Sequence, residues 1–350
     1  MTTAQRFWGG VAVIVLVTLF VYAPAFHAGF IWDDDTLLTR NPLIQSPDGW
    51  WRIWVTTDSK FYFPVTWLSF WVEWRLWGLD ATGYHVTNIL LHIVGTVLLW
   101  RVLERLKVPG AWLGALLFAV HPLNVESVAW IAERKNVLSL LWAAVTVLKY
   151  LDFEKTGRRN QYLAAIGLFA LALLSKSTAV MVPVFLLLAA WWQRGQITRR
   201  DGGRMIPFLA LAFALGLLSI WYQRNMEVLG GTGASQASPN HLRSWLAAGW
   251  TWWFYLLKSI APVGLMTLYP FPSIKTNSFW WYLPVGSMFI ILAGLWWQRQ
   301  RPRVRPVCFA VGVYTIMMFP IWGIALALVW SMPALADHLA HMAVIGMTGF

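Results

Sequence analysis

Three adjacent carboxylates, Asp33, Asp34 and Asp35, follow the first apolar segment of the chain. Like charges side by side repel one another, which tends to raise the pKa of at least one carboxyl group. A carboxylate shifted in this way suits general-base chemistry on a hydroxyl group, and it also suits a divalent cation, which takes oxygen ligands. The other interpretation is a solvated loop end in which one aspartate caps a helix. The residues alone leave these interpretations open.

Further groups that could do chemistry lie at the ends of later apolar segments. The stretch HPLNVESVAWIAERKN, residues 121–136, contains His121, Glu126 and Arg134, and LLSKSTAVMVP contains Lys176. A cation between two apolar runs needs an anionic partner such as a lipid phosphate, or it extends towards the headgroups. The histidine could equally cap a helix, and the charges of 121–136 could pair with one another. Each group therefore has a binding interpretation and a structural one.

Polar residues also recur inside one apolar segment and near the end of the chain. Tyr84, Asn88 and His92 stand at helical spacing and share a face, which favours hydrogen bonding between helices. Asp337 and His338 follow the last long apolar segment. The chain has no glycine-rich phosphate loop, no HExxH and no GxSxG. The soluble nucleotide-dependent folds therefore have no support.

The composition indicates that the solvent of this chain is a lipid bilayer. Of its 350 residues, 58% are hydrophobic and 12% are charged, whereas a soluble domain carries roughly 25% charged residues. The 26 tryptophans agree with this, because tryptophan collects at membrane interfaces. The net charge of +12 does not indicate nucleic acid, because the basic residues stand in short clusters between apolar runs. The single cysteine, Cys308, excludes an internal disulfide and a cysteine-based zinc site.

Apolar segments of membrane-spanning length occur throughout the chain. A transmembrane helix needs roughly 20 mostly apolar residues. The segments that meet this requirement are 8–27, 84–103, 110–130, 137–153, 205–222, 279–298 and 306–330. Two shorter runs, 161–174 and 178–192, can cross if they are tilted. We therefore predict an all-α fold, a polytopic membrane protein with about 9–11 transmembrane helices, in one domain, 1–350.

The basic clusters orient these segments, since lysine and arginine near helix ends mark the cytoplasm. Of the 27 basic residues, 16 fall on one side if both short runs cross and 244–268 does not cross singly. We therefore expect 244–268 to be a re-entrant or interfacial helix within an outer loop, 223–278. The first outer loop, 28–83, holds the acidic triplet and an aromatic interfacial helix. The last apolar run, from Leu339, is too short to cross, so the chain is either truncated or ends in the interface.

The order and spacing of the motifs resemble the GT-C glycosyltransferases, which are membrane enzymes that use lipid-linked sugars. The nearest branch is similar to the transmembrane O-mannosyltransferases that precede tetratricopeptide repeats, and to protein O-mannosyltransferase-like enzymes. The stretches that carry the resemblance are WDDDTLLTRNP, FPVTWLSF, YHVTNILLH, HPLNVESVAWIAERKNVLS, LLSKSTAVMVP and MPALADH. They are spread over nearly the whole chain.

The resemblance implies roles for particular residues. Asp33 and Asp34 match the acidic pair of the family's first outer loop, which activates the acceptor, so they are the implied catalytic residues. The residues implied to hold the lipid phosphate and the sugar are Tyr84, His85, His121, Glu126, Arg134, Lys176 and Asp337. The family often reads Ala-Asp-Arg-Tyr where this chain reads Ala-Asp-His-Leu, at 336–339. A cationic role at that position is therefore open.

The implied function is transfer of a sugar, mannose or another hexose, from a polyprenyl-phosphate carrier to a hydroxyl group of a protein or glycan. The partners would be this lipid-linked donor, the acceptor and membrane lipids, with no nucleic acid and with a divalent cation as the one conceivable cofactor. The site would face the non-cytoplasmic side of a bacterial inner membrane or the endoplasmic reticulum. The alternative is a transporter or lipid-carrier flippase, which would place charged or broken helices near the bilayer midplane. Polar groups at one face favour the enzyme.

Overall fold

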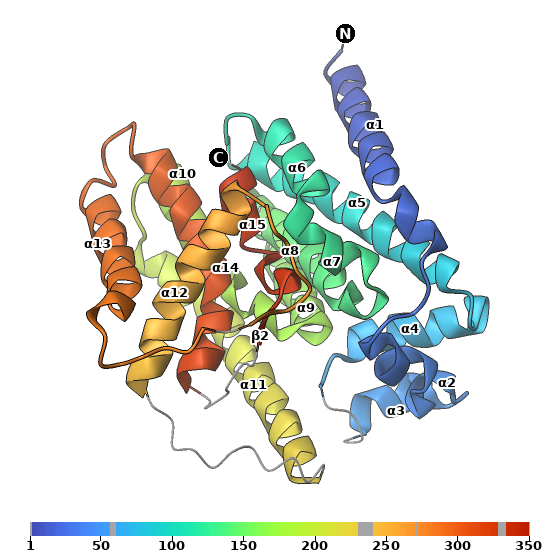
Figure 1. Ribbon diagram of the computed structural model, residues 1–350. Coiled ribbons are helices and arrows are strands. Elements are labelled where there is room, and N and C mark those ends of the chain that lie inside the picture. Colours follow the sequence, from blue (N-terminus) through green and yellow to red (C-terminus); the bar gives the residue numbers. More distant parts are fainter. Residues whose placement is uncertain (1, 57–60, 230–240, 271, 328–333, 350) are drawn as a thin grey trace.

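The computed structural model describes residues 2–56, 61–229, 241–270, 272–327 and 334–349, and most of these are helical (Figure 1). The strands described are β1 (Tyr269–Pro270) and β2 (Ala334–Leu335), which pair antiparallel with Tyr269 opposite Leu335. The predicted all-α fold class is confirmed.

The long helices contain the apolar segments. They are α1 (Thr3–Val21), α5 (Ala81–Arg105), α6 (Ala111–Val120), α8 (Arg134–Thr156), α9 (Arg159–Ser175), α10 (Val182–Arg194), α11 (Arg199–Leu229), α12 (His241–Ile260), α13 (Leu283–Trp297) and α14 (Arg305–Ala327). In the described part of the chain, five helical segments are long and apolar enough to cross a membrane, or six if α6 and the helix after it form one span. With 17 and 13 residues, α9 and α10 are shorter than that. The expected total of about 9–11 crossings stays a prediction.

The short elements lie between α1 and α5 and around the breaks between the later long helices. The first group comprises η1 (Ala23–His27), η2 (Asp35–Thr39), α2 (Pro42–Gln45), α3 (Gly49–Val55) and α4 (Pro64–Trp77). The second comprises η3 (Pro122–Asn124), α7 (Val125–Ala129), η4 (Ile131–Glu133), η5 (Ser177–Met181), η6 (Phe279–Trp281), η7 (Asp337–Ala340) and α15 (Val344–Thr348). In Figure 1 the start of α1 and the turn from α13 to α14 lie towards the top, and α2 and α3 lie at the bottom.

The apolar stretch expected to form one span at 110–130 is divided in the structure. Helix α6 ends at Val120, His121 is extended with φ −66° and ψ 127°, and Pro122 starts the next turn. The helical segments on either side of this break meet at 55°. The physical reason is Pro122, which lacks the N–H that a continuing helix needs and keeps the residue before it out of the helical region. The bend carries Glu126, on α7, away from the line of α6.

The described residues form four clusters of buried apolar side chains, and the two largest hold most of these elements together. The main core lies among the long helices and includes Phe118, Phe169 and Phe208, all fully buried. A second core lies within the segment 28–83 and its contact with α5, and it includes Ile44 and Phe70. Burial of one such side chain stabilises a fold by roughly 1.5–3 kcal/mol. The predicted outer loop 28–83 is thus a packed subregion that meets the membrane helices.

Candidate functional site

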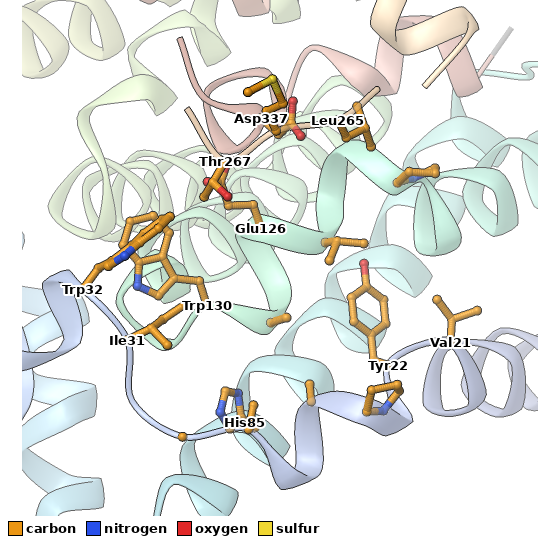
Figure 2. A pocket seen from close by; sticks show the side chains of 18 residues that line it. Val21, Tyr22, Ile31, Trp32, His85, Glu126, Trp130, Leu265, Thr267 and Asp337 are labelled. Atoms are coloured by element: carbon orange, nitrogen blue, oxygen red, sulfur yellow. The ribbon is translucent and has the colours of Figure 1, made fainter. Parts of the chain in front are cut away.

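A cavity of about 850 Å³ lies where the end of α1 and η1 meet α7 and the segments around Thr267 and Asp337. Its wall is largely apolar and aromatic, and Trp32 and Trp130 stand edge to face with ring centroids 5.3 Å apart. The titratable side chains in the wall are Tyr22, His85, Glu126 and Asp337. In Figure 2, Asp337 lies towards the top of the view, Glu126 lies below it near the middle, and His85 lies near the bottom. The cavity therefore combines two carboxyl groups with an apolar surface.

Glu126 is held by the C-terminal segment. Its Oε2 accepts a hydrogen bond from the backbone N–H of His338 at 2.8 Å and lies 3.0 Å from Nδ1 of the same residue. Its Oε1 is buried and has no hydrogen-bond partner among the described residues. A buried oxygen without a partner is costly, and a ligand or water that donates to it would remove that cost.

Asp337 is held by the loop that follows α12. The hydroxyl of Tyr269 donates to Oδ1 of Asp337 at 2.9 Å, and the pairing of β1 with β2 brings the two residues together. Burial raises the pKa of Asp337 to about 6, the charge of Glu126 adds to this effect, and the hydrogen bond from Tyr269 opposes it. A carboxyl group that titrates in this range can exchange protons with a substrate near neutral pH.

The aspartate triplet lies beside the cavity, and none of its members is among the described residues that line it. Asp34 is fully buried and accepts the backbone N–H groups of Ile31, at 2.9 Å, and Ala132, at 2.7 Å. Burial raises the pKa of Asp34 to about 6, and these two hydrogen bonds oppose the shift. Asp33 is exposed, whereas Asp35 accepts the hydroxyl of Thr39 at 3.0 Å within η2. The three neighbours therefore have three different environments.

Arg134 and Tyr84 lie inside the helix packing, away from the residues that line the cavity. The guanidinium group of Arg134 pairs with Glu73, donates to Oδ1 of Asn88 at 2.7 Å and to the carbonyl of Tyr84 at 3.0 Å, and lies 4.6 Å from the centre of the Phe70 ring. The hydroxyl of Tyr84 donates to the backbone carbonyl of Gly78, six residues earlier, at 2.9 Å. These contacts tie α4, α5 and α8 together.

Lys176 and His121 also have protein partners and are outside the set of described lining residues. The amine of Lys176 donates to Oδ1 of Asn136 at 2.5 Å and lies 3.4 Å from Oε2 of Glu133. Burial lowers the pKa of Lys176 to about 8, and Glu133 opposes the shift. Nδ1 of His121 accepts the N–H of Leu123 at 3.2 Å, and its Nε2 lies 3.0 Å from the carbonyl oxygen of Ser259. The anion beside Lys176 is thus a protein carboxylate.

Of the nine predicted site residues, the structure brings His85, Glu126 and Asp337 together around the cavity. Sequence reasoning missed Tyr22 and Trp130 in its wall and Tyr269 behind Asp337. An aromatic residue at the end of an apolar run carries no signal beyond an interfacial preference. Within the described ranges, no group of three or more His, Cys, Asp or Glu side chains is arranged to hold a metal ion.

The fold and the cavity define a multi-pass helical membrane protein with a carboxyl-bearing site beside the end of its first apolar helix. A family model described as dolichyl-phosphate-mannose-protein mannosyltransferase matches residues 64–222. The resemblance seen in the sequence is confirmed, because the chain is similar to protein O-mannosyltransferases, whose family model is of the GT-C membrane class.

Individual relatives agree with this assignment. A protein O-mannosyl-transferase of Caenorhabditis elegans, F38B6.6, is 25% identical over 82% of this chain and 44% of its own length. Tmtc2 of Drosophila melanogaster is 27% identical over 87% of this chain and 32% of its own length. Mouse TMTC4 is 29% identical over 50% of this chain and 28% of its own length. The chain thus spans less than half the length of these relatives. No solved structure matches it significantly.

Proposed function

We propose that the protein transfers a sugar, mannose or another hexose, from a polyprenyl-phosphate carrier to a hydroxyl group of a protein or glycan on the non-cytoplasmic face. The observation that carries the proposal is the cavity of about 850 Å³, with the carboxyl groups of Glu126 and Asp337 in an apolar wall. Small-molecule sites are commonly cavities of ~300–1,000 Å³ with a few polar groups in an apolar lining. The relatives' names, protein O-mannosyl-transferases, support a sugar transfer.

The reaction needs a proton acceptor and a leaving group. The acceptor hydroxyl gives its proton to a carboxylate, its oxygen bonds to the anomeric carbon of the sugar, and the bond from that carbon to the phosphate oxygen breaks. The polyprenyl phosphate leaves with the bonding electrons. Glu126 and Asp337 are the carboxyl groups in the cavity wall that can act as this base. The predicted base Asp33 is exposed and adjacent in the chain to Trp32, so it stays a candidate at the rim.

The cavity wall suggests how the donor lies. Val21, Pro24 and Leu265 offer an apolar surface for the first isoprene units, and Trp32 and Trp130 offer aromatic faces and edges to a sugar ring. In the described ranges no lysine or arginine lines the cavity. The amine of Lys258 donates to the carbonyls of Val263 and Gly264, just before Leu265, at 2.5 and 3.0 Å. We assign the donor phosphate to this end of the cavity, near the amine of Lys258.

The test is transfer by the purified protein in proteoliposomes. Radiolabelled polyprenyl-phosphate mannose and a peptide rich in serine and threonine are supplied, and polyprenyl-phosphate glucose serves as the competing donor. We expect labelled peptide, and we expect Glu126→Gln or Asp337→Asn to reduce the rate by ~10²–10⁴-fold, as loss of a general base does. Glu104→Gln is the control, because Glu104 pairs with Arg101 on the surface. Movement of the lipid across the bilayer without sugar transfer would instead support a flippase.

A further inference from the structure

We propose that His338 is a positioning residue for the cavity, which holds the carboxylate of Glu126 and joins it to a buried cluster of charges around Glu133. The kinetic test of this proposal rests on the proposed function. The structural test rests only on the contacts of His338. It assigns a role to residue 338, where the resemblance left a cationic role open.

The first part of the argument is the contact with Glu126. The backbone N–H and the Nδ1 of His338 both meet Oε2, at 2.8 and 3.0 Å, across 212 residues of sequence. Glu126 stands on α7, a helix of only five residues, so its own element gives little support. Two contacts on one oxygen fix the plane of the carboxylate and leave Oε1 without a partner among the described residues. Oε1 is therefore the oxygen of Glu126 whose hydrogen-bonding capacity the described protein groups leave unused.

The second part is the contact on the other edge of the ring. Nε2 of His338 lies 3.8 Å from Oε1 of Glu133, whose carboxylate also pairs with Lys135 at 2.6 Å and with Lys176 at 3.4 Å. The ring stands edge to face with Trp130, with centroids 5.7 Å apart. The imidazole thus contacts Glu126 through Nδ1, lies near Glu133 through Nε2 and packs against Trp130, and these neighbours limit where its Nδ1 can lie.

The third part of the argument is the packing that fixes the segment bearing His338. Asn136 donates to the carbonyl of His338 at 3.4 Å, and η7 packs against α7. Figure 1 shows the C-terminal segment with α15, in deep red, at the centre of the molecule. Side chains that support a reacting group must be locked by their own packing and hydrogen bonds. The 337–341 segment meets this condition for Glu126.

Substitutions of His338 separate positioning from simple stability. In His338→Asn the side-chain amide stands close to the Nδ1 position and can still donate to Glu126. In His338→Gln the amide reaches towards the Nε2 position, and in His338→Ala neither contact remains. We expect kcat to fall ~10-fold or more in the Ala and Gln variants, and to recover to within about threefold of wild type in the Asn variant, with donor KM nearly unchanged. His27→Asn, at an exposed histidine, is the matched control.

A double-mutant cycle tests the same contact without any activity. We expect the Tm losses of His338→Ala and Glu126→Gln to be clearly non-additive, because the two residues share one interaction. Additive losses, or equal kinetic damage in the Asn and Gln variants, would overturn the proposal. If the wild-type protein transfers no sugar but the Tm losses of the two variants are non-additive, the proposed function is wrong and the contact between His338 and Glu126 is supported.

Discussion

The carboxylate of Asp34 accepts the backbone N–H of Ala132 at 2.7 Å, although 98 residues separate them in the chain. Its other oxygen accepts the N–H of Ile31 at 2.9 Å. Asp34 therefore fastens the segment that bears Trp32 to η4 at the edge of the cavity. The resemblance treats Asp33 and Asp34 as one acidic pair, whereas the structure gives them separate surroundings.

We predict that Asp34→Ala lowers stability far more than Asp33→Ala. Each buried N–H that loses its acceptor costs about 1–3 kcal/mol, and Asp34 serves two of them, whereas substitutions at exposed positions such as Asp33 usually change stability by ~0.5 kcal/mol or less. Thermal unfolding in detergent measures both. If Asp33 is the base, Asp33→Asn loses transfer by ~10²–10⁴-fold at unchanged Tm. Normal transfer by Asp33→Asn would remove it from the reaction.

The second prediction concerns the pH dependence of stability through Asp337. Burial raises the pKa of this carboxyl from 3.8 to about 6 in the folded protein. A carboxyl group whose pKa is raised by folding stabilises the folded protein at pH values below its unfolded-state pKa. This stabilisation, on the order of 3 kcal/mol for a shift of this size, is lost as the pH rises through the folded-state pKa. Between pH 4 and pH 7, wild type should therefore lose stability relative to Asp337→Asn. Parallel Tm curves for the two proteins would contradict this, and Asp33→Asn serves as the control.

The third prediction is that Arg134 acts in folding. Its guanidinium group is fully buried against Glu73, and removal of one partner from a buried ion pair costs about 3–5 kcal/mol. Arg134→Met should lower Tm strongly, and adding Glu73→Leu should restore much of the loss. Arg101→Met, which breaks a half-exposed pair with Glu104, should cost ~1 kcal/mol or less. Normal Tm with lost donor binding would instead favour the substrate contact that the resemblance implies.

The fourth prediction concerns Tyr22 as a contact for the donor. Its hydroxyl is buried in the cavity wall and has no hydrogen-bond partner among the described residues. Tyr22→Phe removes that unsatisfied group, so the empty protein should be as stable as wild type or more so. If the hydroxyl bonds to the sugar, donor affinity should fall by about 0.5–1.5 kcal/mol, which is roughly 2- to 12-fold. Equal donor affinity in the two proteins, measured by equilibrium binding, would exclude that bond.

The fifth prediction concerns orientation in the membrane. The basic clusters place 299–305 in the cytoplasm and the first outer segment outside, and both Thr36 and Arg301 are exposed. In a Cys308→Ala background, Thr36→Cys should react with an impermeant maleimide on intact cells. Arg301→Cys should react only after the membrane is permeabilised. Equal labelling of the two sites on intact cells would show that the assignment of 244–268 as re-entrant or interfacial is wrong.

The sequence by itself determined the features that local composition controls. Apolar runs of bilayer length predict helices such as α5 and α8, because a chain in lipid must satisfy its backbone hydrogen bonds internally. The motifs also predicted a resemblance to protein O-mannosyltransferases. The helices appear in the fold, and the comparisons find the same resemblance. Even the break at Pro122 has a local cause that can be read from the chain, although the apolar pattern concealed it.

Only the tertiary structure decided which polar groups meet. Glu126 and His338 are 212 residues apart, and their contact depends on how the C-terminal segment packs into the centre of the fold. Asp33 and Asp34 are neighbours of one residue type, yet one is exposed and the other buried. The resemblance implies a substrate contact for Arg134, and the folded chain places Glu73 beside its guanidinium group. Burial and pairing determine the charge state of these groups and the atoms that they can contact. Burial and pairing arise from the packing of the folded chain and cannot be read from spacing along the sequence.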